Sequence, residues 1–158
     1  MTRLRRFAGV KILGQISEAF SNLKREGKKG FIPFITAGDP DLATTRDLIV
    51  GLAQAGATVI ELGVPFTDPM ADGPVIQRAS ERALRHGFGL AQVLQTVAEA
   101  REQTGVPIIL FSYFNPLLQF CANAGSADVS SAFSFSFENL AREAKQAGVD
   151  GLLVTDLV

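Results

Sequence analysis

The stretch Thr58-Val59-Ile60-Glu61-Leu62-Gly63-Val64-Pro65-Phe66 is an apolar run interrupted by a single carboxylate. A short continuous apolar run of this kind predicts a buried parallel strand. An ionised carboxylate in such a strand is costly to desolvate unless another group pairs with it or uses it. The loop that follows carries two more acids, Asp68 and Asp72. An acid in a strand that opens onto an acidic, Gly/Pro-rich loop is typical of the acid/base sites of α/β enzymes.

The bulk composition restricts the class of protein. With 158 residues, 47% of them hydrophobic, the chain is long enough for one globular domain with a core. A net charge of −1 argues against a broad nucleic-acid surface. The single cysteine, Cys121, excludes an internal disulfide and suits a reducing, cytoplasmic compartment. No apolar run approaches the roughly 20 residues that span a bilayer, and the lone His and Cys form no metal-binding cluster.

The spacing of apolar residues predicts the order of helices and strands. Strands are predicted at 31–37, 58–66, 107–113 and 151–158, and helices at 16–25, 42–56, 74–86, 90–103 and 137–148. Asp39, which precedes Pro40, is predicted to cap the second helix, and Gly105 to end the fourth. The basic residues 1–15 are interpreted as an N-terminal extension to a domain formed by residues 16–158.

Residues 121–136 lack a clear period and are rich in Ser, Ala, Gly and Asn. This composition predicts a loop or insertion. Within it, Phe133, Phe135 and the following Phe137 alternate with serines, which hints at a short strand.

Alternating strands and helices predict a parallel sheet with helical crossovers. Both a (β/α) barrel and a doubly wound sheet fit, and both place their ligand site at the carboxyl ends of the strands. No glycine-rich dinucleotide motif follows the first strand and no P-loop occurs, which favours the barrel. Residues 60, 62 and 64 are aliphatic and suit a face covered by helices, so Glu61 is expected on the other face, toward the barrel interior.

The longest motif, IELGVPFTDPMADGP at Ile60–Pro74, resembles the signature of the tryptophan synthase alpha chain family. Phe31–Pro40 resembles the first strand and loop of that family, Tyr113–Pro116 the end of its third strand, and Gly148–Leu157 its fourth strand.

The resemblance implies a TIM barrel and a lyase of tryptophan biosynthesis. It implies retro-aldol cleavage of indole-3-glycerol phosphate to indole and glyceraldehyde 3-phosphate. Indole would pass to a beta chain within an alpha2beta2 heterotetramer. Pyridoxal phosphate is expected on that beta partner, and no cofactor or metal on this chain.

The resemblance also assigns roles to residues. Glu61 matches the general acid/base that protonates indole C3, and Asp72 the second acid, which handles the indole N–H. Phe34, Phe111 and Tyr113 match the walls of the indole pocket.

Three further residues, Asp68, Pro65 and Asn115, match positions that face the beta chain. The alternative function is a noncatalytic half-barrel that docks on a partner through the Pro65–Gly73 loop.

Structural interpretations remain open beside these roles. Glu61 could be a buried acid paired with a Lys or Arg, Asp72 the cap of the helix that begins at Pro74, and Asp68 a solvated loop acid. Asp156 could be an acid at the barrel mouth or a residue that forms the turn after the strand. The three aromatic residues could simply belong to the core.

The family barrel needs eight strands and about 250 residues, whereas the sequence as given holds about four strands. The first and fourth strands would then be open edges. We expect this chain by itself to be unstable, to aggregate or pair with another copy, and to lack activity alone.

Overall fold

The computed structural model describes residues 14–123 and 137–157, which form one parallel sheet with helices packed on it. The strands, in the spatial order β1-β2-β3-β4, are β1 Phe34–Thr36, β2 Ile60–Gly63, β3 Ile108–Ser112 and β4 Gly151–Val154. The helices of the described ranges are α1 Gln15–Glu26, α2 Leu42–Gln54, α3 Pro74–Leu84, α4 Leu90–Arg101, α5 Phe114–Asn123 and α6 Phe137–Ala147. The predicted strands and crossover helices are therefore present, with shorter strands than expected.

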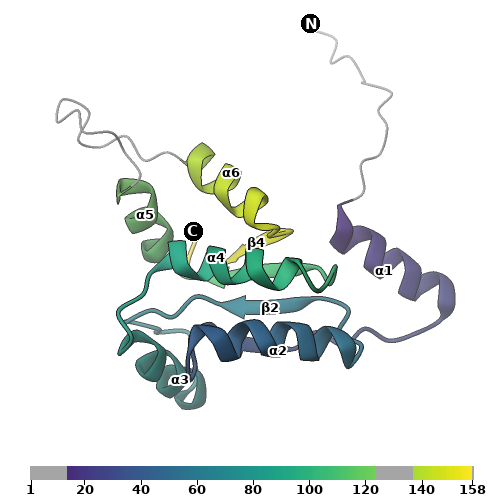
Figure 1. Cartoon of the computed structure of the whole chain (residues 1–158), viewed down its shortest axis with the longest axis horizontal. Helices are drawn as coiled ribbons and strands as arrows, with labels where there is room; N and C mark the ends of the chain where they lie inside the picture. Colours follow the sequence, from purple (N-terminus) through teal and green to yellow (C-terminus); the bar gives the residue numbers. More distant parts are fainter. Residues whose placement is uncertain (1–13, 124–136, 158) are drawn as a thin grey trace, which may run out of the picture.

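The two ends of the sheet differ in what lies beside them. In Figure 1 the arrow of β2 points to the left, where α3 and α5 lie, whereas α1 lies at the opposite end. Helices α2 and α4 lie side by side in front of the strands in the same view. Because all four strands are parallel, their carboxyl ends meet at the edge near α3 and α5.

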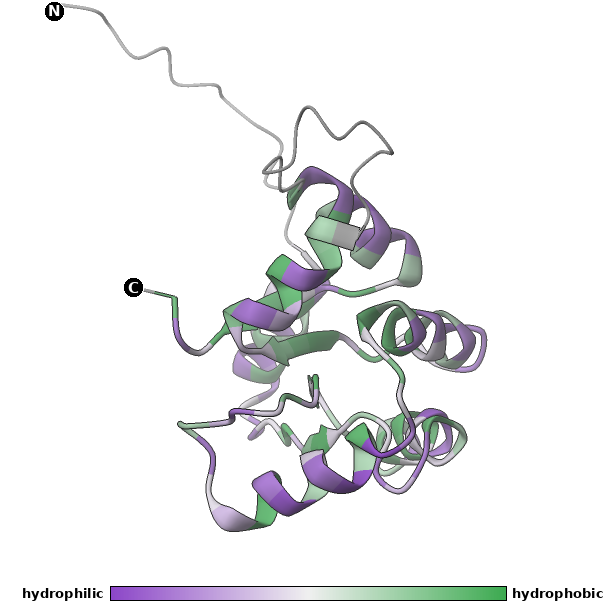
Figure 2. Cartoon of the chain, turned by 90° about the vertical axis from the view of Figure 1, so that its left-hand side faces the viewer, coloured by the Kyte–Doolittle hydropathy of each residue, from purple (hydrophilic) through white to green (hydrophobic). Residues whose placement is uncertain are grey.

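The core lies between one face of the sheet and the helix layer. Ile60, Leu62, Ile108 and Leu110 are fully buried there, in one cluster with buried side chains of α2 and α4. Figure 2 looks onto the carboxyl ends of the strands and shows α2 and α4 end-on, hydrophobic toward the sheet and hydrophilic outward. The predicted aliphatic face is thus the helix-covered one.

The strand register fixes which side chains share the other face. Phe34 pairs with Glu61, and Glu61 pairs with Ile109. Two residues further along, Gly63 pairs with Phe111. Since side chains alternate along a strand, these residues lie opposite the face that Leu62 buries against the helices.

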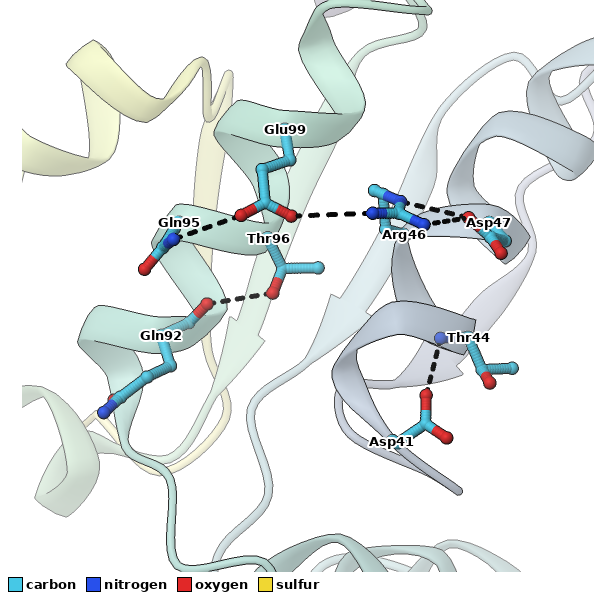
Figure 3. Close-up of polar contacts among 8 residues, drawn as sticks. All are labelled: Asp41, Thr44, Arg46, Asp47, Gln92, Gln95, Thr96 and Glu99. Carbon is cyan, nitrogen blue, oxygen red and sulfur yellow. Dashed lines mark hydrogen bonds and ion pairs between the residues drawn. The ribbon is translucent and has the colours of Figure 1, made fainter.

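Polar contacts add to the apolar contact between α2 and α4. The guanidinium of Arg46 on α2 contacts the neighbouring Asp47 at 2.9 Å and reaches Glu99 on α4 at 3.9 Å (Figure 3). The side chains of Arg46, Asp47 and Glu99 are all at least partly exposed to solvent, so these ion pairs contribute little to stability.

The predicted cap of α2 is wrong by two residues. Asp41 is the N-cap, and its carboxylate accepts the Thr44 N–H at 2.7 Å. Asp39 instead receives two hydrogen bonds from the Arg82 guanidinium on α3, at 2.8 and 2.7 Å. Both acids precede a residue suited to a first helical turn, so the local pattern does not distinguish them.

Helix α5 is absent from the sequence prediction, which treated Asn115-Pro116 as a break. Pro116 is the third residue of α5, and a proline is tolerated in a first turn because N–H groups there have no helical acceptor. The predicted loop 121–136 is therefore wrong at its start, since Cys121 belongs to this helix. Residues 124–136, with the suggested strand at Phe133 and Phe135, lie outside the described part, as do residues 1–13.

The fourth helix also ends earlier than predicted. Its last residue is Arg101, with Glu102 at the C-cap, so Gly105 does not end the helix. Within the described ranges, none of the helices is long and apolar enough to cross a membrane.

Arg101 joins three segments at the amino ends of β3 and β4. Its guanidinium donates to the carbonyls of Val106 and Gly148 and to the carboxylate of Asp150. The same carboxylate accepts the Ile108 N–H at 2.9 Å. The side chains of Arg101 and Asp150 are only 17% and 12% exposed, so the pair is largely shielded from water.

We predict that Arg101→Met destabilises the chain by about 3 kcal/mol, because it leaves a buried carboxylate and two carbonyls without their donor. The matched control, Arg46→Met on the exposed bridge, should cost less than about 1 kcal/mol. Pulse proteolysis in urea at low protein concentration measures both. Equal losses for the two variants would contradict the assignment of Arg101 as a structural clamp.

We predict a pH dependence for the contact between the β1–α2 loop and α3. Hydrogen bonds from Arg82 hold the pKa of Asp39 below its ordinary value of 3.8. This contact therefore stabilises the fold above that pH and is lost as the pH falls below it. Asp39→Asn should be less stable than the unaltered chain at pH 7, and the difference should shrink as the pH drops below 3.8. A difference that stays constant across this range in urea unfolding would refute the prediction.

Candidate active site

The candidate site lies on the face of the sheet opposite α2 and α4, at the carboxyl ends of β1, β2 and β3. Glu61 is in the middle of β2 on this face, partly buried. Within residues 14–123 and 137–157, no Lys or Arg forms an ion pair with it and no group hydrogen-bonds to its carboxylate. The interpretation of Glu61 as half of a buried ion pair thus finds no support in the described residues.

Aromatic rings flank Glu61 on the same face. Phe34 and Phe111 meet edge to face, with ring centroids 5.4 Å apart and an interplanar angle of 83°. Phe34 also lies over Gly63, where an added Cβ would come within 2.5 Å of the ring. Both rings are partly buried and outside the main core cluster, so they form an apolar surface beside the carboxylate.

Asp72 lies in the loop between β2 and α3. It shares a small hollow with Phe34, Phe111 and Tyr113. The N-cap of α3 is Gly73 and no side chain caps that helix, so the alternative role of Asp72 as a cap is wrong. Its backbone is fixed instead: its N–H donates to the Pro69 carbonyl at 3.0 Å, and its carbonyl accepts from the Gln77 amide at 2.9 Å.

Tyr113 follows β3 and is only 6% exposed. Its hydroxyl accepts the Ala71 N–H at 2.8 Å, and its ring lies 5.3 Å from that of Phe66. Burial raises the pKa of this phenol; the Ala71 N–H lowers it and the neighbouring Asp72 carboxylate raises it further. The predicted pocket residue is therefore also a hydrogen-bonding partner of the loop that carries Asp72.

The three residues predicted to face a partner lie beyond the carboxyl ends of β2 and β3, two of them exposed and one buried. Asp68 is exposed and accepts a hydrogen bond from the Thr67 hydroxyl at 2.6 Å. Asn115 is exposed on the first turn of α5, whereas Pro65 is buried. Pro65 and Asn115 line one hollow of about 770 Å³, together with residues of the loop before α4.

Asp156 has a structural role that sequence reasoning did not identify. Its carboxylate accepts a hydrogen bond from the Phe114 N–H at 2.7 Å. Asp156, which follows β4, thus provides an acceptor for the first N–H group of α5. This contact joins residues 42 positions apart, and no local pattern signals it.

The described residues contain no group of three or more His, Cys, Asp or Glu side chains arranged to hold a metal ion. The hollow beside Asp72 has four polar side chains, Thr36, Asp72, Ser80 and Tyr113, and Glu61 is not among its lining residues. Glu61 lies on the same face of the sheet, as the strand partner of Phe34 in that lining. Such a set can donate and accept protons next to an apolar, ring-shaped ligand.

The fold and site together define a (β/α) unit of the TIM-barrel class, with one carboxylate within β2 and a second in the loop after it. Comparison with known proteins identifies the family. The model of the tryptophan synthase alpha chain family matches residues 20–158, and the chain belongs to that family.

Similar proteins cover the same part of the chain. The tryptophan synthase alpha chain of Citrifermentans bemidjiense is 49% identical over 92% of this chain and 49% of its own length. That of Dechloromonas aromatica is 50% identical over 91% of this chain and 48% of its own length. The chain therefore spans about half the length of the curated relatives that it matches.

Solved structures agree in fold. The tryptophan synthase alpha subunit of Legionella pneumophila superposes with a TM-score of 0.79 at 40% identity, over 92% of this chain and 50% of that one. A tryptophan synthase chain from M. tuberculosis gives a TM-score of 0.77 at 28% identity, over 92% of this chain and 52% of that one. The predicted architecture, four parallel strands of a TIM barrel, is thus confirmed.

We predict that Gly63→Ala displaces the Phe34 ring and destabilises the chain by about 1–3 kcal/mol, the usual cost of overpacking. Adding Phe34→Leu should reduce that loss, because the smaller side chain makes room for the new methyl group. Urea unfolding of both single variants and the double variant measures the effect. If the losses in the free energy of unfolding of the two single variants add up to that of the double variant, Phe34 does not lie on Gly63.

Proposed function

We propose that this chain supplies the acid/base residues for cleavage of indole-3-glycerol phosphate to indole and glyceraldehyde 3-phosphate. One observation carries the proposal: Glu61 lies on the face opposite the helix layer, beside aromatic rings, in a chain of the tryptophan synthase alpha family. A ring-shaped substrate fits that apolar surface, and a carboxyl group next to it can exchange a proton with the substrate.

In the proposed reaction, the Glu61 carboxyl protonates indole C3, and positive charge develops on the indole nitrogen. A proton then leaves a glycerol hydroxyl, whose electrons form the aldehyde carbonyl. The carbon–carbon bond to indole C3 breaks, and its electron pair returns to the ring. Glu61, now a carboxylate, can accept the hydroxyl proton, so that one group serves both steps.

Asp72 acts on the other part of the ring in this proposal. Its carboxylate accepts a hydrogen bond from the indole N–H and stabilises the positive charge that develops on the nitrogen. Phe34 supports a shared site for the two acids, because it is the strand partner of Glu61 and also shares a hollow with Asp72. One aromatic side chain thus connects the surroundings of the two carboxylates.

The proposal includes a partner. We propose that the rim formed by Asp68, Pro65 and Asn115 faces a tryptophan synthase beta chain, which carries pyridoxal phosphate and receives the indole. The hollow of about 770 Å³ beside Pro65 and Asn115 supports this, because it offers a concave surface next to the catalytic loop. The alternative is a noncatalytic half-barrel that only docks on a partner, and the same hollow is compatible with that function.

We predict that Glu61→Gln lowers kcat for indole-3-glycerol phosphate cleavage by about 100-fold or more, because an amide cannot transfer the proton. Asp72→Asn should lower kcat by about 100–1,000-fold, the range for loss of one charge-stabilising group. The assay follows indole release by the intact protein, with and without a beta chain. Near-full cleavage by Glu61→Gln would remove the basis of the proposal. Stimulation of a beta chain by a protein with no cleavage activity of its own would favour the docking module.

A further inference from the structure

Two side-chain hydrogen bonds connect the loop that carries Asp72 to its surroundings: one from the Gln77 amide of α3 to the Asp72 carbonyl, and one from the Ala71 N–H to the Tyr113 hydroxyl after β3. Residues 67–73 form turns in which Met70 N–H donates to the Asp68 carbonyl and Asp72 N–H to the Pro69 carbonyl, at 2.9 and 3.0 Å. These contacts are internal to the loop. The Ala71 N–H, directly before Asp72, instead reaches across to the Tyr113 hydroxyl at the end of β3.

The Tyr113 hydroxyl can form a second hydrogen bond. It accepts the Ala71 N–H, and a phenol also carries one proton that it can donate. Asp72 is the carboxylate beside it, and it lines the same hollow. The effect of the Asp72 carboxylate on the pKa of this phenol agrees with that proximity. The hydroxyl that accepts the Ala71 N–H thus belongs to a residue that lines the same hollow as Asp72.

The Tyr113 ring is itself held in place. It is almost completely buried, and Phe66, which precedes the loop, contacts it at a centroid distance of 5.3 Å. The hydroxyl therefore has a defined position, set by the backbone directly after β3 and by the contact of the ring with Phe66. A fixed donor and acceptor can define the position of an otherwise exposed turn, in which Met70 is 92% exposed.

We propose that Tyr113 is a positioning residue, whose hydroxyl holds the turn at Ala71 and directs the Asp72 carboxylate toward the ring of the substrate. This role differs from that of a pocket wall, because it depends on the hydroxyl and not on the ring. It rests on the proposed function, since Asp72 is the group that Tyr113 positions.

The first test removes the hydroxyl alone. In the intact protein with its beta chain, Tyr113→Phe should lower kcat for indole-3-glycerol phosphate cleavage about tenfold or more and leave KM nearly unchanged, because small displacements of catalytic groups are costly. In an Asp72→Asn background the same change should have little further effect, because the group that Tyr113 positions is already lost.

The control is a residue that contacts the same hollow without a polar group. Phe111→Leu should raise KM, and its effect should persist in the Asp72→Asn background. If Tyr113→Phe instead raises KM and remains fully additive with Asp72→Asn, Tyr113 is only a wall of the pocket and the proposal is overturned.

A second readout does not depend on activity. By NMR-detected hydrogen exchange, the Ala71 amide should exchange about fivefold faster in Tyr113→Phe, the factor that one hydrogen bond is worth. The Ile60 amide, bonded to the Pro107 carbonyl, is the control and should not change. Unchanged exchange at Ala71 would overturn the proposal. If the unaltered protein does not cleave the substrate even with a beta chain present, the proposed function fails, and this exchange experiment still decides whether Tyr113 holds the loop.

Discussion

The parallel register of β1, β2 and β3 is the constraint on which the rest of the structure depends. It aligns Phe34, Glu61 and Ile109 across the sheet and places Leu62, one residue further along, in the core against the helices. A shift of one residue in β2 would bury a carboxylate among aliphatic side chains and expose Leu62. The desolvation of Glu61 and the burial of Leu62 therefore favour the same register, and that register puts the acid beside the aromatic rings.

Contacts between neighbouring loops then fix the rim around Glu61. Arg82 on α3 binds Asp39 after β1, the Tyr113 hydroxyl after β3 binds Ala71 after β2, and Asp156 after β4 binds the start of α5. Each contact joins segments that follow different strands, so the carboxyl ends of the sheet are connected from β1 to β4. A site built from several strand ends needs such contacts, because each loop alone is a short exposed turn.

The sequence predicted the parts of this structure that depend on local pattern. Apolar spacing located the four strands and most helices, and the aliphatic residues 60, 62 and 64 predicted the face of Glu61. Helix α5 was missed because Pro116 was treated as a breaker, although prolines fit a first turn. The contacts of Tyr113 with Ala71 and of Asp156 with Phe114 each span 42 residues, and only the fold brings these groups together.

The orientation of Glu61 can be measured directly by thiol labelling. In a background with Cys121→Ser, one variant carries Glu61→Cys and a second carries Leu62→Cys. Our account predicts that a small thiol reagent labels position 61 in the native protein, whereas position 62 reacts only after unfolding, because it lies in the core. Labelling of position 62 at a rate equal to or above that of position 61 would place Glu61 against the helices and contradict the account.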